Sequence, residues 1–534
     1  MKRLFLLVGI WSILTIACQQ EPPGKPESVQ SPPRLGGIYR AALPFRPQLL
    51  DPAFSTDIYS VTLMQQIFDG LVQFDRNLNV IPALATTWKV SNDGLRYTFT
   101  IRQDASFHNG RRVTANDFVY SFTRILDPKE ESSALGFFEK VKGAVTYRSG
   151  KSKEILGLKA RDSHTLEITL EEPFAPFLAV LAMKYSKAVP REEVERWGKE
   201  FGYHPVGTGP FRLESFESDR IVLSANRDYY EGPPYLERVV YSVYPGAQNE
   251  KMAEEFLTEL LEEAPVYAEF REQLSGKETY KLLRKPTLSL LFYGMNCRIE
   301  PLSNPLVRQA INYAINKHQI VGEVYKDQFV VADTLLPPGM PGYFPENASL
   351  AHDAQKAREL LEKAGYSSAR PLPALTILSA SHSRLAQKEF ALLQADLEAV
   401  GITLNVIYQT DWPAFETQLR QGKFMLYRYA WFADIPDPDN FLGALCGSAS
   451  SDNFMGYKNP RVDTLFTQAL TEVDPLKRAA LYREAETIVL REAPMVPLLY
   501  LTFESAFQAY VKGLEISALG SHYIPLKKVW LEEH

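Results

Sequence analysis

The sequence predicts a mixed α/β protein built from several domains. The chain has 534 residues, and a single hydrophobic core stops growing at ~250–300 residues, so two or three domains are expected. The early part carries alternating strand patterns, whereas strands alternate with well-capped helices from about residue 286 onward. That strand, helix, strand rhythm is typical of a mixed α/β domain.

Two half-buried strands are expected in the early part. In residues 95–102, apolar and polar side chains alternate directly after the turn residues 92–94. They alternate again in residues 165–171, until Pro173 ends the pattern. Alternation with a period of two places one face of each strand against a core.

The later part predicts capped helices that alternate with strands. Asn or Asp at the start of a helix and Gly just past its end satisfy backbone groups that the helix leaves unbonded. These signals predict helices from Asn304 and Pro305 to about Lys317, from Asp353 to Gly365, from about Leu385 to Gly401 and from Asp474 and Pro475 onward, with strands at 375–378 and 402–408.

The charge of the chain argues against nucleic acid as a partner. The net charge is −6 and the pI is near 5.9, whereas phosphate binding needs a basic face. The chain is also rich in aromatic residues, with 27 Tyr, 30 Phe and 6 Trp. Such an excess suits a protein that lines a large binding site, and it equally suits a large core.

The N-terminus predicts a secretion signal that ends in a lipidation site. Lys2 and Arg3 precede an apolar run that ends at Ala17 and is shorter than the ~20 residues that a membrane-spanning helix needs. Residues 15–17, which read Thr, Ile and Ala, resemble the bacterial lipobox that precedes an acylated Cys, here Cys18. Thr at the first of these positions departs from the usual Leu.

We therefore expect a signal peptide at 1–17, a lipid on Cys18 and a disordered tether at 18–34, which is rich in Pro, Gln, Glu and Ser. The alternative is an ordinary cleavage site beside an incidental Cys18. In the oxidising compartment that this implies, Cys297 and Cys446 either pair or, as we favour, stay free and buried.

Common catalytic motifs are missing from the sequence. The chain has no GxSxG, SxxK or HExxH motif and no GxxxxGKS or GxxxxGKT phosphate loop. Its eight His residues are scattered singly, without metal-ligand spacing. Asp437 and Asp439 lie in a loop broken by Pro, where we expect them to be solvated rather than catalytic. The sequence thus predicts a protein that is not an enzyme and has no cofactor or metal ion; a secreted hydrolase is the less favoured alternative.

A long block of the sequence resembles a known family. Residues 85–128, which read ATTWKVSNDGLRYTFTIRQDASFHNGRRVTANDFVYSFTRILDP, are similar to the signature of the solute-binding proteins of peptide ABC importers, the family 5 or oligopeptide/dipeptide-binding group. The chain departs from the family at 258–263, where TELLEE replaces the usual Gly-x-x-Asp motif and puts a local turn in question. Further similar segments follow in order at 206–216, 226–245, 304–317, 360–366, 430–442 and 478–500.

The resemblance implies a two-lobed fold of the periplasmic-binding-protein type, with a hinge and an extra domain on lobe one (cluster C type). The lobes would close over a ligand, because contacts from both lobes are made only in the closed state. Lobe one would take residues 35–56, 190–285 and 500–534, the extra domain 57–189, and lobe two 286–499.

The resemblance also implies which residues bind the ligand. In peptide-binding members, an Asp at the position of Asp434 takes the α-ammonium group, and a carboxylate pairs well with an ammonium where water is excluded. Arg428 and His382 match positions that meet the ligand carboxylate, which the planar guanidinium group suits. Trp431 and Trp412 match aromatic residues that line side-chain pockets.

Backbone groups of residues 430–432, which include Phe432 of the expected site, and of residues 56–58 would bind an extended ligand in the manner of an added strand. Each side chain also has a purely structural interpretation. Asp434 would begin a turn, Arg428 would be a solvated residue at a strand end, His382 would lie in a plain loop, and the two Trp would be core residues.

Together with the secretion signal, these features predict an extracytoplasmic lipoprotein of an ABC importer, in the periplasm or at the cell surface. We expect a monomer that binds short peptides and delivers them to a membrane permease. One alternative is the same fold with another cargo, namely a nickel chelate, haem, an oligosaccharide or an opine. Another is a lipoprotein that only senses or contacts partners.

Overall fold

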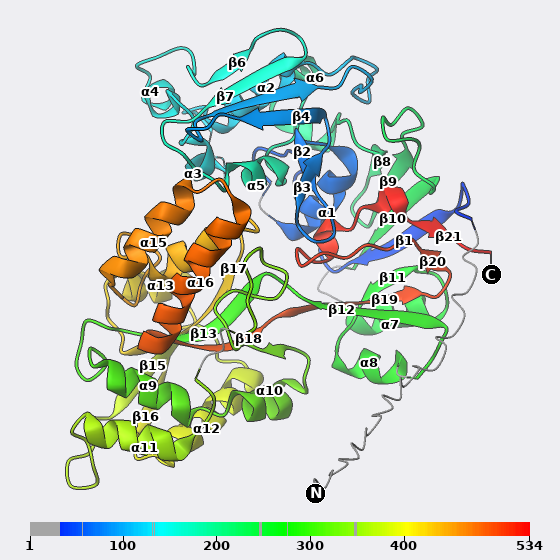
Figure 1. Ribbon diagram of the computed structural model, residues 1–534. Coiled ribbons are helices and arrows are strands. Elements are labelled where there is room, and N and C mark those ends of the chain that lie inside the picture. Colours follow the sequence, from blue (N-terminus) through cyan, green and yellow to red (C-terminus); the bar gives the residue numbers. More distant parts are fainter. Residues whose placement is uncertain are drawn as a thin grey trace, which may run out of the picture.

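The computed structural model describes residues 32–533, except 56, 131, 133, 245–247, 275 and 347–349. The predicted signal peptide, Cys18 and most of the tether therefore lie outside the described residues. Within the described part, no helix is both long enough and apolar enough to cross a membrane. Figure 1 shows two large α/β bodies with a smaller third body at the top.

The first large body, called lobe one here, is built on a seven-stranded mixed sheet of order β12-β19-β11-β1-β10-β9-β8. The helix α1 (Ile58–Ile67) packs against this sheet, with Leu63 and Ile67 in one core with Tyr39 and Tyr241. The strands are β1 (Ile38–Leu43), β8 (Phe211–Phe216), β9 (Arg220–Ala225), β10 (Arg238–Val243), β11 (Glu263–Pro265), β12 (Tyr280–Pro286) and β19 (Thr502–Gln508), and the further helices are α6 (Arg191–Trp197), α7 (Asn249–Leu257) and α8 (Ala268–Leu274).

The second large body, lobe two, has a six-stranded sheet of order β14-β18-β13-β17-β15-β16. Helices cover both faces of it, which explains why every residue of the central strand β13 (Ser289–Met295) is buried. The other strands are β14 (Val330–Val331), β15 (Leu375–Ser379), β16 (Leu404–Tyr408), β17 (Leu426–Phe432) and β18 (Met495–Tyr500). One face carries α9 (Pro305–Ala314), α10 (Lys317–Tyr325), α11 (Ala354–Lys363) and α12 (Arg384–Glu398), and the other carries α13 (Trp412–Arg420), α14 (Leu442–Cys446), α15 (Pro460–Thr471) and α16 (Pro475–Glu492).

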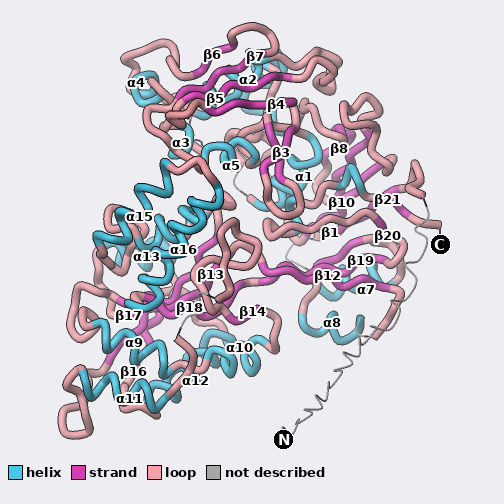
Figure 2. The backbone as a smooth tube through the Cα atoms, in the orientation of Figure 1, coloured by secondary structure: helices cyan, strands magenta, loops and turns pink. Residues whose placement is uncertain are grey.

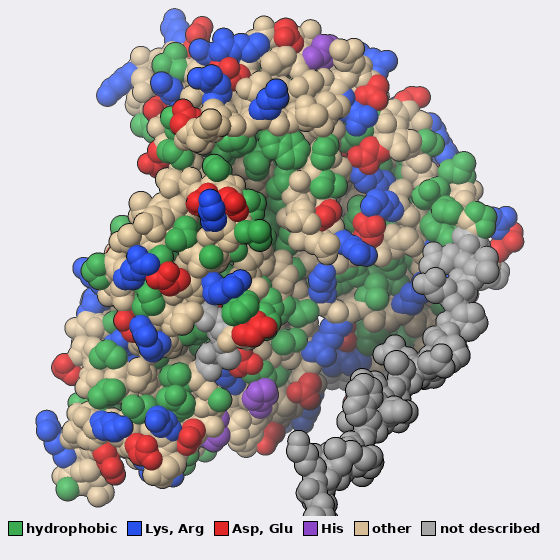
Figure 3. Space-filling view, in the orientation of Figure 1, with side chains coloured by type: hydrophobic (Ala, Val, Ile, Leu, Met, Phe, Trp, Pro, Cys, Tyr) green, Lys and Arg blue, Asp and Glu red, His purple; other side chains and the backbone are tan. Residues whose placement is uncertain are grey.

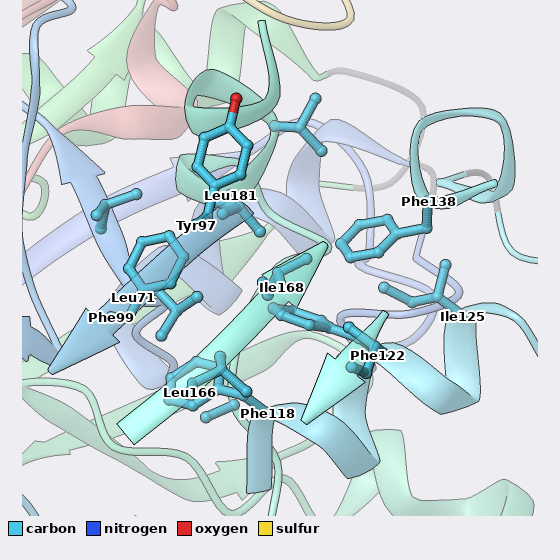
Figure 4. Packing of buried hydrophobic residues seen from close by; sticks show 14 of the residues in the cluster. Leu71, Tyr97, Phe99, Phe118, Phe122, Ile125, Phe138, Leu166, Ile168 and Leu181 are labelled. Carbon is cyan, nitrogen blue, oxygen red and sulfur yellow. The ribbon is translucent and has the colours of Figure 1, made fainter. Parts of the chain in front are cut away.

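The third body is a four-stranded antiparallel sheet, β4-β5-β7-β6, packed on α2 (Ala115–Ile125). Phe118 and Phe122 of α2 lie against Phe99 and Leu166 of the sheet (Figure 4). Its strands are β4 (Ala85–Val90), β5 (Arg96–Ile101), β6 (Leu158–Ala160) and β7 (Thr165–Thr169), and short helices follow at α3 (Leu135–Phe138), α4 (Ala144–Arg148) and α5 (Phe177–Ala182). Smaller elements are the hairpin β2 (Val72–Phe74) and β3 (Val80–Pro82), the pair β20 (Val511–Lys512) and β21 (Trp530–Leu531), and 3₁₀ turns at Gly198–Tyr203, Pro438–Asn440, Ser521–Tyr523 and Leu526–Lys528.

Two strand pairs connect the lobes. β12 leads into β13 through residues 287–288, and β18 leads into β19 through Leu501, so that the strands run from one body to the other (Figure 2). The two connections are bonded to each other, because the Thr287 N–H donates to the Leu501 carbonyl at 2.8 Å and the Leu501 N–H donates to Ser289 Oγ at 3.0 Å. Crossing strands of this kind are where a hinge motion between lobes is absorbed.

Lobe two also touches the third body. The side chain of Ile435, which follows β17, is buried in the core of the third body. The Ala175 N–H donates to the Leu470 carbonyl at 2.9 Å across the same boundary. Packing also places α1 with lobe one, although the predicted extra domain begins at residue 57. The predicted domain boundaries stay a prediction.

Most of the predicted elements are confirmed within a few residues. The strands expected at 95–102 and 165–171 are β5 and β7, and the helices expected after Asp353 and Asp474 are α11 and α16, each capped by that Asp. The helix after Asn304 ends at Ala314, earlier than expected, because the Asn316 side chain caps a second helix, α10.

The turn that replaces the usual Gly-x-x-Asp motif is present. Glu259 directly follows the helix α7 and its cap Thr258, and it adopts φ of +60°, in the left-handed region that favours glycine. A residue with a side chain costs about 1–2 kcal/mol in that conformation. The chain thus keeps a tight turn in spite of its departure from the family motif.

The two cysteines of the described part are free thiols. Cys446 is fully buried in lobe two, and Cys297 is half-buried against the same core. Burial raises the pKa of both thiols, so both are protonated at neutral pH. Of the two alternatives left open by the sequence, the free pair is the one that the structure has.

Candidate ligand-binding site

A cavity of about 580 Å³ lies between the three bodies, within the ~300–1,000 Å³ typical of small-molecule sites. Hydrophobic side chains gather in the recess between the bodies (Figure 3). The charged groups that line the cavity are few, which makes each of them important for what binds. The walls come from lobe one (Ile58, Val61, Phe503, Ala518, Leu519, Gly520, His522, Tyr523), the third body (Phe137, Met183, Lys184, Tyr185), the hinge (Thr287, Leu288) and lobe two (Phe432, Ala433, Asp434).

Asp434 is the acidic group of this cavity, and it lies two residues beyond the end of β17. Its own N–H donates to Asn440 Oδ1 at 2.8 Å, and its carbonyl accepts from the Tyr185 hydroxyl at 3.4 Å. Burial raises the pKa of the Asp434 carboxyl, while Asn440 and the ammonium group of Lys184 act in the opposite direction. The backbone of Asp434 is thus bonded to its own loop and to the third body, and the residue is exposed in this structure.

Lys184 is the cationic group of the cavity, and it comes from the third body. Burial lowers the pKa of its ammonium group, while the carboxylates of Asp57 and Asp434 raise it. His522 lies nearby, with Nδ1 3.1 Å from Thr62 Oγ1. Burial lowers the pKa of His522 to about 4, so this ring is neutral at neutral pH. The cavity therefore has one acidic group, Asp434, and one cationic group, Lys184.

Lys184, Tyr185 and His522 could not be predicted from the sequence, because no short motif marks them. They reach the cavity from segments remote from β17; Tyr185, for example, is 249 positions away from Asp434.

β17 offers an open strand edge beside the cavity. On one side it pairs with β13 along its whole length. On the other side β15 pairs only with Leu426 and Tyr427, so within the described residues no strand covers Arg428–Phe432 on that side. An extended chain can add to such an edge through backbone hydrogen bonds, which do not depend on side-chain identity.

Arg428 lies on the face of β17 that packs on α12. Its Nε donates to Glu389 Oε1 at 2.8 Å and its Nη2 to Glu389 Oε2 at 3.1 Å. Glu389 is fully buried and also accepts from the hydroxyls of Tyr293, at 2.8 Å, and Tyr325. The guanidinium group is therefore already engaged by a buried carboxylate, in the structure as it stands.

The remaining predicted residues divide into two groups. Phe432 lines the cavity beside Asp434 and is 57% exposed, whereas Trp431 lies on the other face of β17, where its Nε1 donates to the Asn440 carbonyl at 2.6 Å. His382 and Trp412 lie farther along the open edge. The His382 ring is 4.2 Å from that of Tyr408, and Trp412, itself 50% exposed, is 5.8 Å from the ring of Tyr429.

The expectation that Asp437 and Asp439 are solvated is wrong. Asp437 is buried and accepts two 2.7 Å hydrogen bonds from the guanidinium group of Arg478. Asp439 accepts from the Tyr482 hydroxyl at 3.2 Å, and burial, with the charge of Asp437, raises its pKa to about 6. This pair fixes the loop after Asp434 to α16. Within the described residues, no cluster of three or more His, Cys, Asp or Glu is arranged to hold a metal ion.

Comparison with known proteins identifies the family. Residues 79–453 match the family model described as bacterial extracellular solute-binding proteins, family 5 Middle. The chain belongs to this family. Heme-binding protein A of Haemophilus influenzae is 29% identical over 544 residues, covering 96% of this chain and 97% of the relative. Dipeptide-binding protein DppE of Bacillus subtilis is 30% identical over 509 residues, covering 91% and 90%.

Solved structures confirm the two-lobed fold. The unliganded open form of MppA, a periplasmic murein tripeptide binding protein, has a TM-score of 0.84 at 26% identity, covering 93% of this chain and 98% of that one. DppA from Helicobacter pylori in complex with the peptide STSA has a TM-score of 0.71 at 29% identity, covering 94% and 99%. The TM-score is thus higher for the unliganded open form of MppA than for the peptide complex of DppA. The predictions of family and fold class are confirmed.

Proposed function

We propose that this family 5 solute-binding protein is the receptor of an ABC importer for short peptides, which it binds between its lobes and delivers to a membrane permease. The observation that carries the proposal is the position of Asp434, an accessible carboxylate in a mostly apolar cavity beside the open edge of β17. A peptide has both complementary parts, namely an ammonium group and an extended backbone. Binding and release then require no catalytic step.

Asp434 would hold the α-ammonium group of the peptide. Removing water on closure strengthens this pair, because a charge-assisted hydrogen bond is stronger in a low-dielectric site. Residues 430–432 would pair with the peptide backbone along the open edge, and Phe432 would cover its first side chain. We keep residues 56–58 in this proposal as a further source of backbone contacts, although residue 56 lies outside the described residues.

The carboxylate end of the peptide would lie farther along the edge. His382 and the half-exposed Trp412 are the side chains at that end. Trp431 lies on the other face of β17 and bonds the Asn440 carbonyl. Arg428 would act there by sharing its guanidinium group between Glu389 and the ligand, since a guanidinium group has five N–H donors. For the shortest peptides, Lys184 offers a second cation close to Asp434.

The site of action would be the outer face of a bacterial membrane. We propose that Cys18 carries the lipid and that residues 18–34 tether the monomeric receptor near its permease. A tether raises the effective concentration of a receptor at its partner. The lipid, the monomeric state and the permease are parts of the proposal that rest on the sequence and on the family.

Native mass spectrometry of gently purified protein tests the proposal. Co-purified peptides, displaced by added dipeptides or tripeptides, are the expected result. The same purified protein is also tested for haem, because one relative is named a heme-binding protein. A Soret absorbance in the purified protein, or a mass shift equal to haem without any peptide, would favour haem over peptides.

A further inference from the structure

A second cavity, of about 190 Å³, lies in lobe one directly behind the ligand cavity. The two cavities share the wall residues Ile58, Phe503 and His522. Most of the other walls are apolar, from β1 and from the segment that follows β19. This arrangement suits a side chain that enters from the ligand cavity and passes these three residues.

One of the two carboxylates in the wall of this second cavity is Glu263, at the start of β11. Its Oε2 accepts from the Tyr39 hydroxyl at 2.7 Å, and its Oε1 accepts from Ser505 Oγ at 3.1 Å. Both donors are neutral. Among the described residues, no Lys or Arg forms an ion pair with Glu263. The carboxylate is thus oriented by two hydroxyls and has no counter-charge from the described part of the chain.

The other ionisable groups around this cavity do not supply a cation. Glu504 is the second carboxylate of the wall and is paired with Arg271, whose Nε lies 2.7 Å from Glu504 Oε1. His522 is neutral at neutral pH for the reason given above. Burial raises the pKa of Glu263, and the hydroxyls of Tyr39 and Ser505 oppose that rise. A cation brought by a ligand would favour the ionised carboxylate.

The neighbouring residue Glu262 provides a comparison, because its carboxylate is paired with a cation of the chain. Glu262 is buried and accepts from the Arg40 guanidinium group at 2.8 Å and from the Arg40 N–H at 2.6 Å. The two consecutive glutamates therefore differ in two respects. Glu262 has a cation from the chain and lies outside the cavity wall, whereas Glu263 lines the cavity and has no cation among the described residues. These differences point to a ligand rather than to stability as the role of Glu263.

We propose that the second cavity binds the basic side chain, lysine or arginine, of a peptide held in the ligand cavity, with Glu263 as its counter-charge. The inference rests on the proposed function and adds a substrate class to it. Lysine and arginine combine an aliphatic stem with a charged head, which matches apolar walls that end at a carboxylate. An apolar side chain would bring no counter-charge to the carboxylate of Glu263.

Calorimetric binding of tripeptides tests this proposal. Each position of a trialanine host is replaced in turn by lysine and by norleucine, which is close in length and uncharged. In the wild type, we expect lysine to bind about tenfold or more tightly than norleucine at one position, since tenfold corresponds to one charge-assisted contact. The variant Glu263→Gln should reduce that ratio to near one, and the control Glu262→Gln should leave it unchanged.

Two results would overturn the proposal: no position with a preference for lysine, or an equal preference in the wild type and Glu263→Gln. Binding of trialanine itself reports on the proposed function separately, because it does not involve Glu263. If trialanine binds and the lysine preference is absent, only the second-cavity proposal fails. If no peptide binds, both fail. Thermal unfolding of each variant shows that it is folded before its ratio is interpreted.

Discussion

Replacing Asp434 with asparagine removes one negative charge from the ligand cavity and keeps the shape of the side chain. The backbone contacts of Asp434 with Asn440 and Tyr185 do not involve its carboxylate. The Asn440 side chain also bonds the carboxylate, and the amide oxygen of an asparagine can accept the same hydrogen bond, so the loop is expected to keep its position. What changes is the partner of the ligand's ammonium group. The variant therefore separates the binding role of Asp434 from its place in a turn.

The magnitude follows from the surroundings of Asp434. Losing one partner of a desolvated charge pair costs about 2–5 kcal/mol, which is roughly 30-fold to several thousand-fold in affinity. Lys184 lies close enough to affect the pKa of Asp434, and in the variant it would repel the ligand's ammonium group. Because Asp434 is exposed in this structure, most of the loss should arise when the lobes close over the ligand.

A thermodynamic cycle measured by calorimetry provides the test. Free and N-acetylated forms of one peptide are titrated into the wild type and into Asp434→Asn. Acetylation removes the ammonium group, so the acetylated peptide should bind weakly to both proteins and the two losses should not add. The control Asp452→Asn changes a half-buried acid that lies near Asp434 but outside the wall of the cavity. Additive losses, or equal affinity of wild type and variant for the free peptide, would refute the reasoning.

The affinity that depends on the pair of Asp434 and the ligand's ammonium group should change with pH in a defined direction. Asp434 must be ionised to hold an ammonium group, and burial raises its pKa in the open cavity. Affinity of the wild type should therefore fall on acidification, beginning above the pH of ~3.9 at which an ordinary Asp is half protonated. Asp434→Asn should lack this component. A parallel fall in both proteins would assign the titration to another group.

Three further predictions concern stability and location. Glu259→Gly should raise the free energy of unfolding by about 1 kcal/mol, because it relieves a left-handed backbone. The control Glu250→Gly, in α7, should lower it by about 1 kcal/mol. Chemical denaturation that shows a loss of stability for both variants would contradict this. Glu389→Gln should lower the free energy of unfolding by about 3–5 kcal/mol, since it leaves the buried charge of Arg428 unpaired. A change below ~1 kcal/mol in the same assay would mean that the Arg428–Glu389 pair contributes little to stability. Cys18→Ala should move the protein from the membrane fraction to the soluble fraction and remove the lipid mass; a variant that stays membrane-bound with an unshifted mass would exclude the lipid.

Local features of the fold could be predicted from the sequence because they depend on neighbouring residues. The Asp353 and Asp474 caps accept hydrogen bonds from N–H groups two or three residues ahead. The start of each helix therefore depends on a few neighbouring residues. The alternation that predicts β5 likewise needs only one strand and a core on one side. The helix after Asn304 was predicted too long, since its end depends on Asn316, which caps the next helix.

Of the candidate site, the sequence could predict only the part that lies on one continuous segment. Asp434 and Phe432 both line the cavity, because both follow from the course of β17, and their roles in ligand binding stay predictions. The state of Arg428 did not follow from that motif. Its carboxylate partner, Glu389, is on α12, and only the packing of that helix on the sheet shows that the guanidinium group is already engaged.

By itself, the sequence determined the family, the α/β class, the order of most elements and the residue expected to hold an ammonium group. The tertiary structure decided what shares the cavity with Asp434. Lys184 comes from the third body and His522 from lobe one, and a second cavity lined by Glu263 shares three wall residues with the first. The physical reason is that a site between lobes is assembled by long-range packing, whereas caps, alternation and motifs record only short-range interactions along the chain.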